Sequence, residues 1–281
     1  MEVRLAEHMG FCFGVRRAED LIEKAASEHG QMTTLGQLVH NRQVAARLRE
    51  LGVRAVNSLE EVDTPVVAIS AHGAPPETAE IAARHGLKVI DGTCPFVRKA
   101  QLAARELAQQ GFAVLIFGDP AHREVKGILG WAGTGARVMA DEGALPAECP
   151  GRKVGIVSQT TQNVDNLRKL TEAVTARWLV ELAELRVVNT ICYASVDRQQ
   201  AAEELAREVD VIVVIGGRDS ANTGRLSEVC ARTGTPVHQV EDVDALQRDW
   251  FTGVRVVGVT AGASTPDWVI GRVTGWLQEL S

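Results

Sequence analysis

The sequence predicts an α/β fold built from three copies of one strand–helix unit, each with a parallel sheet and related by a pseudo-threefold axis. Apolar runs that suit buried strands alternate with amphipathic stretches that suit helices, and this order is typical of parallel sheets. A cysteine precedes a predicted helix three times, at Cys12, Cys94 and Cys192. The residue 24 positions after each cysteine is a glycine, and the residue 28 positions after it is polar: His40, His122 and Ser220. Such regular spacing indicates an internal repeat.

The first repeat is expected at residues 13–95. A helix is predicted over 15–26, because Val15, Ala18 and Ile22 fall on one face. The clearest strand lies at 65–75 and carries Ser70 and His72 at its carboxyl end. The other expected elements are a weak strand and turn at 33–43, a helix from Val44 to Gly52, a strand at 53–56, a short acidic helix at 58–62, a helix at 78–84 and a strand at 87–91.

The second repeat, residues 96–193, is expected to follow the same order. Pro95 suits the first position of its opening helix, where an N–H would have no partner. The apolar strand 113–118 leads to a polar stretch with His122 and Glu124, and a strand in 153–163 ends near Thr160. The remaining expectations are a short strand and acidic helix at 136–145, a loop at 130–135, an amphipathic helix after residue 163 and a strand at 185–189.

The third repeat, residues 194–281, lacks its final strand. Its most apolar strand, at 209–217, leads to a glycine-rich turn with Ser220 and Asn222, and a strand in 254–266 ends near Ser264. A short strand and acidic helix are expected at 236–246. Because no strand follows the last helix, the N-terminal strand within residues 1–12 is expected to complete the third unit.

Composition excludes several classes of protein. A hydrophobic content of 45% with 23% charged residues is that of an ordinary globular chain. The net charge of −6 argues against general nucleic-acid or anionic-membrane binding, which needs a basic face. The chain lacks an apolar run long enough to span a bilayer, and its start lacks the order of a signal peptide. We therefore expect a cytoplasmic protein with no nucleic-acid or membrane partner.

The cysteines predict a metal centre. Five cysteines in a chain without export signals are more often reduced, metal-bound or catalytic than disulfide-bonded. Only three occupy equivalent repeat positions, whereas Cys149 is expected in a loop and Cys230 on a buried helix face. Ligands in parallel α/β sheets bind beyond the carboxyl ends of the strands, so the pseudo-threefold axis would bring the three repeat cysteines together. Three thiolates at helix starts favour a central iron–sulfur cluster, and a four-iron cluster with three protein ligands keeps one iron open to a substrate.

Polar residues at the same strand ends predict an anion-binding rim. They are His40, His72, His122, Glu124, Thr160, Ser220, Asn222 and Ser264. Imidazoles, hydroxyls and an amide beside glycine-rich helix starts can donate many hydrogen bonds to a phosphate or diphosphate. Glu124, two residues after His122, would be the natural proton donor in a closed cavity beside a redox metal.

Two other functions remain open from the residues. A structural zinc held by three cysteines and a histidine would make the chain a scaffold or binding protein, although zinc ligands usually come in closely spaced pairs. An iron–sulfur sensor or phosphate-binding module without turnover would not need a carboxylate in the cavity.

Nine short motifs give the chain a resemblance to a known family. They are GFCFGV, VHNR, SAHG, DGTCP, AHREV, SQTTQ, ICYA, SANT and TAGASTP, and they occur in this order along essentially the whole chain. The chain resembles the 4-hydroxy-3-methylbut-2-enyl diphosphate reductases of the non-mevalonate isoprenoid pathway. The resemblance implies an oxidoreductase with a three-lobed α/β fold and an oxygen-sensitive [4Fe-4S] cluster. It would reductively remove the allylic hydroxyl of the substrate and give isopentenyl and dimethylallyl diphosphates.

The resemblance also implies roles for individual residues. The cluster would be held by Cys12, Cys94 and Cys192, and its open iron would take the substrate hydroxyl. The substrate would be bound by His40, His72, His122, Thr160, Ser220, Asn222 and Ser264. Glu124, helped by Thr160 and His122, would deliver protons, and a ferredoxin or flavodoxin would supply electrons. One departure stands out, because relatives often have two adjacent serines where this chain has Ser220 and Ala221, so one hydroxyl to the diphosphate is missing.

Overall fold

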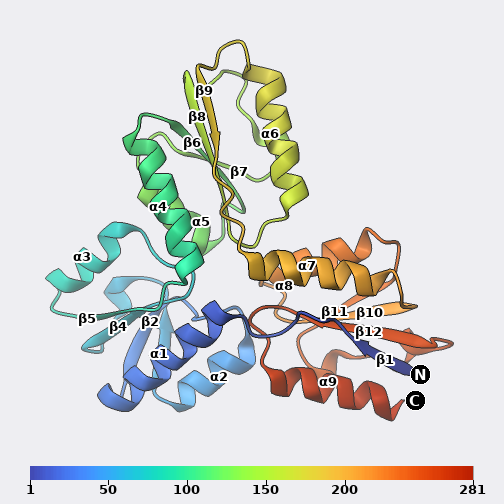
Figure 1. Cartoon of the computed structure of the whole chain (residues 1–281). Coiled ribbons are helices and arrows are strands. Elements are labelled where there is room, and N and C mark those ends of the chain that lie inside the picture. Colours follow the sequence, from blue (N-terminus) through green and yellow to red (C-terminus); the bar gives the residue numbers. More distant parts are fainter. Residues whose placement is uncertain (281) are drawn as a thin grey trace. The chain divides into compact units, whose positions relative to one another are not determined.

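The computed structural model describes residues 1–280 and contains three parallel four-stranded sheets with helices, as predicted (Figure 1). The chain divides into two compact units. The terminal unit contains residues 1–16, 39–47 and the chain from residue 193 on, and the central unit contains residues 17–38 and 48–192. The predicted division into three domains, 13–95, 96–193 and 194–281 with 1–12, stays a prediction.

The terminal unit contains one sheet in the order β1-β12-β10-β11. Its strands are β1 (Glu2–Leu5), β10 (Val211–Ile215), β11 (Val237–Val240) and β12 (Val256–Ala261). Its helices are α7 (Tyr193–Ala206), α8 (Ala221–Ala231), α9 (Asp267–Glu279) and the short 3-10 helices η3 (Val243–Ala245) and η4 (Arg248–Phe251). The first strand of the chain pairs in parallel with β12. It therefore lies at the edge of a sheet whose other strands come from the end of the sequence.

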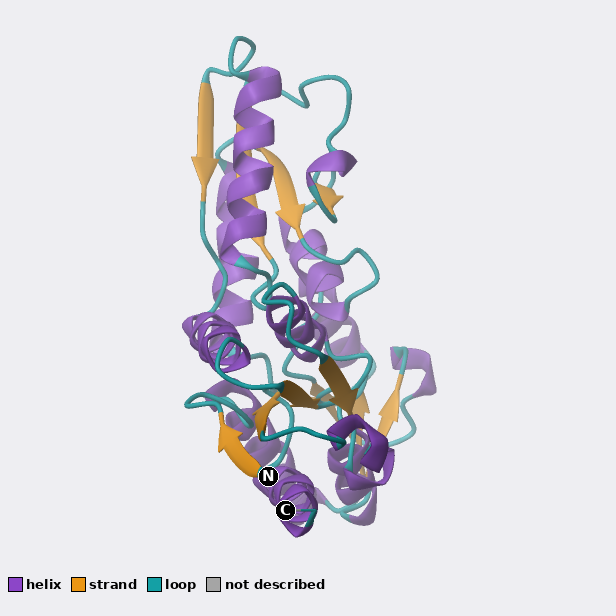
Figure 2. Cartoon of the chain, turned by 90° about the vertical axis from the view of Figure 1, so that its right-hand side faces the viewer, coloured by secondary structure: helices purple, strands orange, loops and turns teal. Residues whose placement is uncertain are grey.

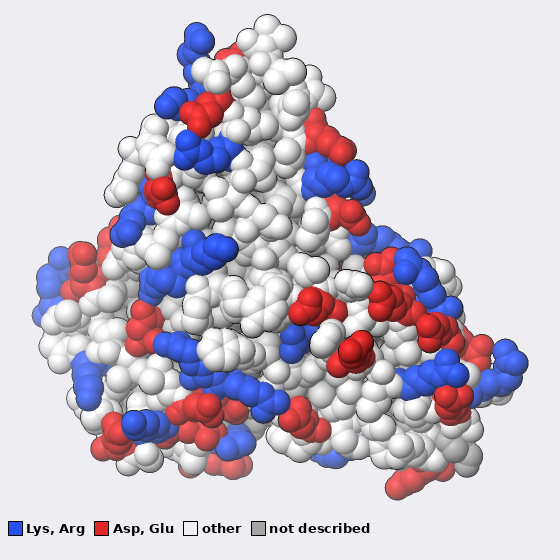
Figure 3. Space-filling model, viewed as in Figure 1, with Lys and Arg blue, Asp and Glu red and all other residues white. Residues whose placement is uncertain are grey.

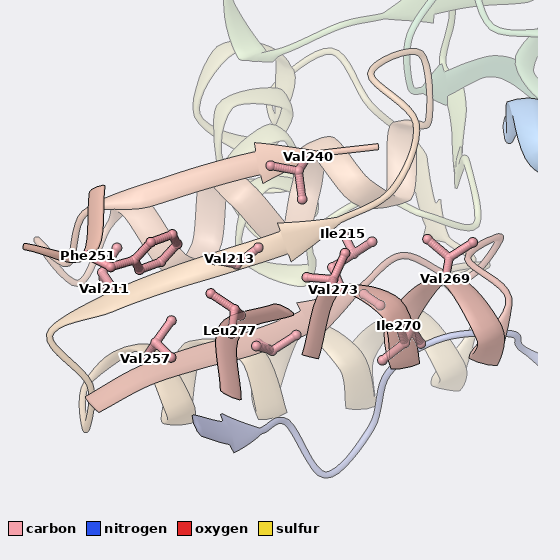
Figure 4. Close-up of a cluster of buried hydrophobic side chains, with 12 residues drawn as sticks. Val211, Val213, Ile215, Val240, Phe251, Val257, Val269, Ile270, Val273 and Leu277 are labelled. Carbon is pink, nitrogen blue, oxygen red and sulfur yellow. The ribbon is translucent and has the colours of Figure 1, made fainter. Parts of the chain in front are cut away.

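The central strand β10 is apolar throughout because both of its faces are buried. Val213 packs towards α9, whereas Ile212 and Val214 pack towards α7 and α8. Figure 4 shows Val213 with Val273 and Leu277 of α9 in the first of these layers. A strand covered on both faces reads as an unbroken apolar run, and VIVVI is such a run.

The central unit contains two sheets. The first has the order β3-β2-β4-β5 and is built from β2 (Met32–Leu35), β3 (Val53–Val56), β4 (Val66–Ile69) and β5 (Lys88–Asp91). The helices in this part of the sequence are α1 (Phe13–His29), η1 (Leu59–Glu61) and α3 (Pro76–Arg84), and α2 (Arg42–Glu50) contributes its last residues. Every residue of β4 is buried, as expected for one of the two inner strands of this sheet.

The second sheet has the order β7-β6-β8-β9. Its strands are β6 (Ala113–Phe117), β7 (Arg137–Met139), β8 (Lys153–Ser158) and β9 (Glu184–Val187), with helices α4 (Pro95–Gln109), α5 (Arg123–Ala132), η2 (Glu142–Ala144) and α6 (Val164–Trp178). Helices α4 and α5 share one apolar layer with the sheet, and α6 packs in another layer with Leu115 and Phe117. Figure 1 and the turned view in Figure 2 show helices on both faces of these strands.

The repeat recurs in the hydrogen bonds of the strand ends. Gly36, Gly118 and Gly216 directly follow β2, β6 and β10. The N–H of each donates to the last carbonyl of the neighbouring edge strand, at Val56, Met139 and Val240, over 2.6, 2.9 and 2.8 Å. The glycine spacing predicted from the cysteines therefore marks structurally equivalent positions.

The sequence prediction was wrong for the expected loop 130–135, and it did not indicate where helix α8 begins. Residues 130–132 of the expected loop 130–135 belong to α5, and only the rest is irregular. Gly130 permits this helix to pack closely against Pro75, because a Cβ at this position would lie 2.6 Å from the Pro75 side chain. Helix α8 begins within the expected glycine-rich turn.

No helix within residues 1–280 combines the length and apolar character that crossing a membrane requires. On the face shown in Figure 3, Lys and Arg side chains are interspersed with Asp and Glu. The predicted cytoplasmic location stays a prediction.

Candidate active site

The three repeat cysteines occupy equivalent local positions. Each directly precedes a helix, α1, α4 or α7. The N–H groups of Cys12, Cys94 and Cys192 donate to the carbonyls of Ala263, Ala71 and Thr160 over 3.2, 3.0 and 3.0 Å. These carbonyls belong to the second residue after β12, β4 and β8. One strand end therefore fixes the backbone of each cysteine directly before the start of a helix.

The two remaining cysteines have structural environments, as expected. Cys149 lies in a loop and its thiol contacts the carbonyl oxygen of Gly151 at 3.1 Å. Cys230 is fully buried in α8, and burial, reinforced by the charge of Glu203, raises the pKa of its thiol to about 12. None of the five cysteines, all within the described part of the chain, forms a disulfide.

A turn before two of the cysteines was missed by the sequence analysis. The N–H of Thr93 donates to Oδ1 of Asp91 at 2.9 Å, and the N–H of Ile191 donates to Oδ1 of Asn189 at 3.0 Å. Aspartate and asparagine side chains favour such turns because they accept from the backbone two residues on. The signal was an Asp or Asn three residues before Cys94 and Cys192.

In the central unit, Glu124 is a buried acid whose carboxylate is held by Thr160. It lies in the first turn of α5 and is 2% exposed. The backbone N–H of Thr160 donates to Oε1 at 2.6 Å, and the Thr160 hydroxyl lies 3.0 Å from Oε2. Burial raises the pKa of Glu124 to about 7, against the opposing effect of the two hydrogen bonds from Thr160. The carboxyl group can therefore exchange a proton near neutral pH.

Thr160 connects this acid to a cysteine. Its N–H and hydroxyl contact Glu124, while its carbonyl accepts the N–H of Cys192. The three residues come from α5, the end of β8 and the start of α7. Thr160 thus brings three predicted site residues together.

Two of the predicted histidines also meet in the central unit. Nδ1 of His122 accepts the N–H of Glu124 at 3.2 Å and so caps α5. Neutral His122 therefore carries its proton on Nε2. The rings of His122 and His72 lie 5.2 Å apart, centre to centre, and nearly perpendicular. Nδ1 of His72 is 3.5 Å from Oγ of Ser70.

The terminal unit brings together four other predicted residues. Oγ of Ser220 accepts the N–H of Thr223 at 3.3 Å and caps α8, and Oγ of Ser264 donates to the carbonyl of His40 at 3.4 Å. A Cβ at Gly217 would lie 2.5 Å from the same His40 carbonyl, so only glycine permits this approach. Asn222 is 5% exposed, and neither its Oδ1 nor its Nδ2 has a hydrogen-bond partner among the described residues.

An unsatisfied buried amide at a helix start indicates a ligand site. Leaving a buried polar group without a partner costs about 1–3 kcal/mol, and native proteins rarely do so without a functional reason. Asn222 lies in the first turn of α8, where backbone N–H groups favour an anion. These residues can therefore bind an oxyanion by directed hydrogen bonds.

Comparisons with known proteins agree with the sequence motifs. The family profile described as LytB protein matches residues 3–278. A 4-hydroxy-3-methylbut-2-enyl diphosphate reductase of Dehalococcoides mccartyi strain CBDB1 is 44% identical, covering 100% of this chain and 99% of the relative. The enzyme of the same name from Geobacter metallireducens is also 44% identical, covering 100% and 98%.

Two solved structures are also similar. The E-1-hydroxy-2-methyl-but-2-enyl-4-diphosphate reductase of Plasmodium falciparum superposes with a TM-score of 0.90 at 25% identity, covering 99% of this chain and 88% of that one. A structure described as (E)-4-hydroxy-3-methyl-but-2-enyl diphosphate reductase, the terminal enzyme of the non-mevalonate pathway, gives 0.69 at 39% identity, covering 99% and 100%. The resemblance found from nine short motifs is thus confirmed over the whole chain, which belongs to the LytB protein family, the oxidoreductases known as 4-hydroxy-3-methylbut-2-enyl diphosphate reductases.

Proposed function

We propose that this chain converts (E)-4-hydroxy-3-methylbut-2-enyl diphosphate to isopentenyl and dimethylallyl diphosphates. The reaction consumes two electrons and two protons, breaks the allylic C–O bond, forms a C–H bond and releases water. The observation that carries the proposal is Glu124, a buried acid with a pKa of about 7. Thr160, which holds its carboxylate, also binds the N–H of Cys192. Such an acid beside a redox centre is what proton-coupled C–O cleavage needs.

We propose that Cys12, Cys94 and Cys192 hold a [4Fe-4S] cluster. Their chemistry fits the group, since all three are cysteines at helix starts, each fixed by a hydrogen bond from its N–H to a strand end. When bound, such a cluster supplies single electrons and offers one iron without a protein ligand to an oxygen of the substrate.

The acid side chain and Thr160 set the path of the proton. Oε1 of Glu124 accepts the Thr160 N–H, so the proton of the neutral carboxyl belongs on Oε2. Oε2 lies 3.0 Å from the Thr160 hydroxyl, which can take that proton while passing on its own. The proton is thus delivered from the Thr160 side of the carboxyl. His122, protonated on Nε2 when neutral, adds a second donor near the same helix start.

The remaining residues are proposed to bind the diphosphate. They are His40, His72, His122, Thr160, Ser220, Asn222 and Ser264. What supports this is the capping of α5 and α8 by His122 and Ser220, which places two helix starts behind the donors. Ala221 removes one hydroxyl from the first turn of α8, but Asn222 retains two polar atoms there for a ligand.

The partner that supplies electrons is proposed to be a ferredoxin or flavodoxin. Either carries single electrons at low potential, as a two-step reduction requires. The substrate is a small diphosphate, and its anionic groups match the hydrogen-bond donors described above.

The decisive experiment measures iron, sulfide and zinc on protein purified without oxygen. We expect about four irons and four sulfides per chain, as a [4Fe-4S] cluster contains. The preparation should also reduce the hydroxymethylbutenyl diphosphate when a chemical reductant is present. Cys94→Ser should lose the cluster, whereas Cys149→Ser should keep it because the Cys149 thiol is bonded within its own loop. Zinc without sulfide after anaerobic reconstitution would support the structural zinc site instead, and a full cluster without turnover would support the sensor.

A further inference from the structure

The loop that carries His72 is held at three points within the central unit. It joins β4 to α3 and contains residues 70–75. The carbonyl of Ala71 accepts the N–H of Cys94 at 3.0 Å, and the N–H of Gly73 donates to the carbonyl of Ser70 at 3.0 Å. Gly73 has φ +72°, which closes the turn directly after His72. These contacts fix the first half of the loop.

The second half depends on the carbonyl of Ala74. It accepts Nε1 of Trp131 at 3.0 Å and Nε2 of Gln101 at 3.4 Å. Trp131 comes from α5 and Gln101 from α4, so two helices donate to one backbone oxygen. The amide of Gln101 also lies against Gly73, where a Cβ would be 2.4 Å from Nε2.

Gln101 cannot turn its amide over without losing a partner. The side chain is 0% exposed, and its Oε1 accepts NH1 of Arg98 at 2.8 Å. Arg98 is held in turn by Asp91 at 2.5 Å and lies 5.0 Å from the centre of the Trp131 ring. Because an arginine can only donate, Oε1 faces Arg98 and Nε2 faces the loop. This series of contacts, from Asp91 through Arg98 to Gln101, thus orients the Gln101 amide N–H towards the carbonyl of Ala74.

We propose that Gln101 and Trp131 are positioning residues for His72. They act through the backbone of Gly73 and Ala74 and hold the His72 ring against His122, where both rings can reach the same diphosphate. This inference rests on the proposed function, because it assigns the two residues to substrate binding. Neither is expected to touch the substrate. Their loss should therefore weaken substrate binding and leave the rate of the reaction step unchanged.

Two substitutions remove the donors to the Ala74 carbonyl. Gln101→Met keeps most of the buried volume but loses the whole amide, including the Oε1 that accepts from Arg98. Trp131→Phe keeps an aromatic ring beside Arg98 and loses the N–H. Gln109→Met on the exposed face of the same helix is the matched control. All variants should be assayed as anaerobic, cluster-loaded protein, with iron and sulfide measured in each.

We expect the double variant to raise KM and the dissociation constant for inorganic diphosphate about tenfold, because the Ala74 carbonyl loses both side-chain donors and no longer fixes the loop. The kcat per cluster should stay within about twofold, since the acid Glu124 is not bonded to either residue. Hydrogen exchange in a peptide that spans residues 70–75 should become faster, and Gln109→Met should change none of these values.

Equal KM and equal exchange in the double variant and the wild type would overturn the inference, as would a loss of kcat in proportion to a loss of cluster. Failure of the proposed function looks different, because the wild type itself would then neither reduce the substrate nor bind diphosphate. Hydrogen exchange would still report whether the two residues hold the loop.

Discussion

Glu124 gives the sharpest test of the proposed chemistry. Burial raises its pKa from 4.5 to about 7, and the hydrogen bonds from Thr160 oppose that rise. Proton delivery needs the protonated form, so kcat should fall as the pH rises through 7. In Glu124→Gln the hydrogen-bond acceptor remains at Oε1, but no acidic proton is left. That variant should keep its cluster and lose turnover.

The size of the effect follows from the pKa. At pH 7 about half of a carboxyl with a pKa of about 7 is protonated, against about 0.3% at a pKa of 4.5. Burial thus increases the protonated fraction of Glu124, which is the form that can donate a proton, about 150-fold at pH 7. Between pH 7 and pH 8 the protonated fraction falls from about a half to about a tenth, so kcat should fall about fivefold.

The same carboxyl must affect stability in the opposite sense from a salt-bridged acid. Its folded-state pKa lies above its unfolded value, so the unfolded state loses the proton first as pH rises. The free energy of unfolding should therefore decrease between about pH 4.5 and 7 and lose about 3 kcal/mol from this group. Glu124→Gln should lack this decrease.

Two measurements check both effects. The first is kcat from pH 5.5 to 9 with saturating substrate and an excess of reduced methyl viologen. The second is urea unfolding of the wild type and Glu124→Gln at pH 5 and pH 8. A kcat that is flat or rises across pH 7, together with equal stability differences at both pH values, would refute the assignment of Glu124 as the buried acid.

Three further predictions concern the structure around the site, and Gly30→Ala is the control for the first. Gly36→Ala should destabilise by about 1–3 kcal/mol, because φ is +79° and the new Cβ would lie 2.6 Å from the Arg123 guanidinium. Gly30→Ala, with φ +74° and no atom within 4 Å, should cost less in the same urea titration. Ala221→Ser should tighten diphosphate binding about tenfold by adding a hydroxyl to the first turn of α8, as calorimetry would show. Val213→Ala should lower the free energy of unfolding by about 2–3 kcal/mol, since Val213 is 0% exposed beneath α9.

The repeat of cysteine and glycine could be predicted from the sequence because it reflects backbone requirements. Gly118 is needed after β6 since a Cβ there would lie 2.7 Å from Val125. A cysteine before each helix marks where the chain turns from one strand into the next helix. Such local constraints require the same residue types at a fixed spacing in the sequence, and buried strands require runs of apolar residues.

Helix α5 could not be recognised in the same way. It contains Gly127 and Gly130, which disfavour helices in isolation. It forms because Val125 and Ile128 are fully buried in the layer shared with α4, and its glycines fit against Ala74 and Pro75. Tertiary packing overrides propensity here, and a single sequence does not show the packing partner.

The placement of Glu124 explains why burial, and not a nearby cation, can set its pKa. An arginine or lysine beside the carboxyl would satisfy its charge and lower the pKa below the useful range. The groups that bond it, the N–H and hydroxyl of Thr160, are uncharged, so they hold the carboxyl in place and lower the pKa less than burial raises it. Thr160 also binds the N–H of Cys192. One residue therefore fixes both the acid and a proposed ligand of the cluster, and a change at Thr160 must disturb both together.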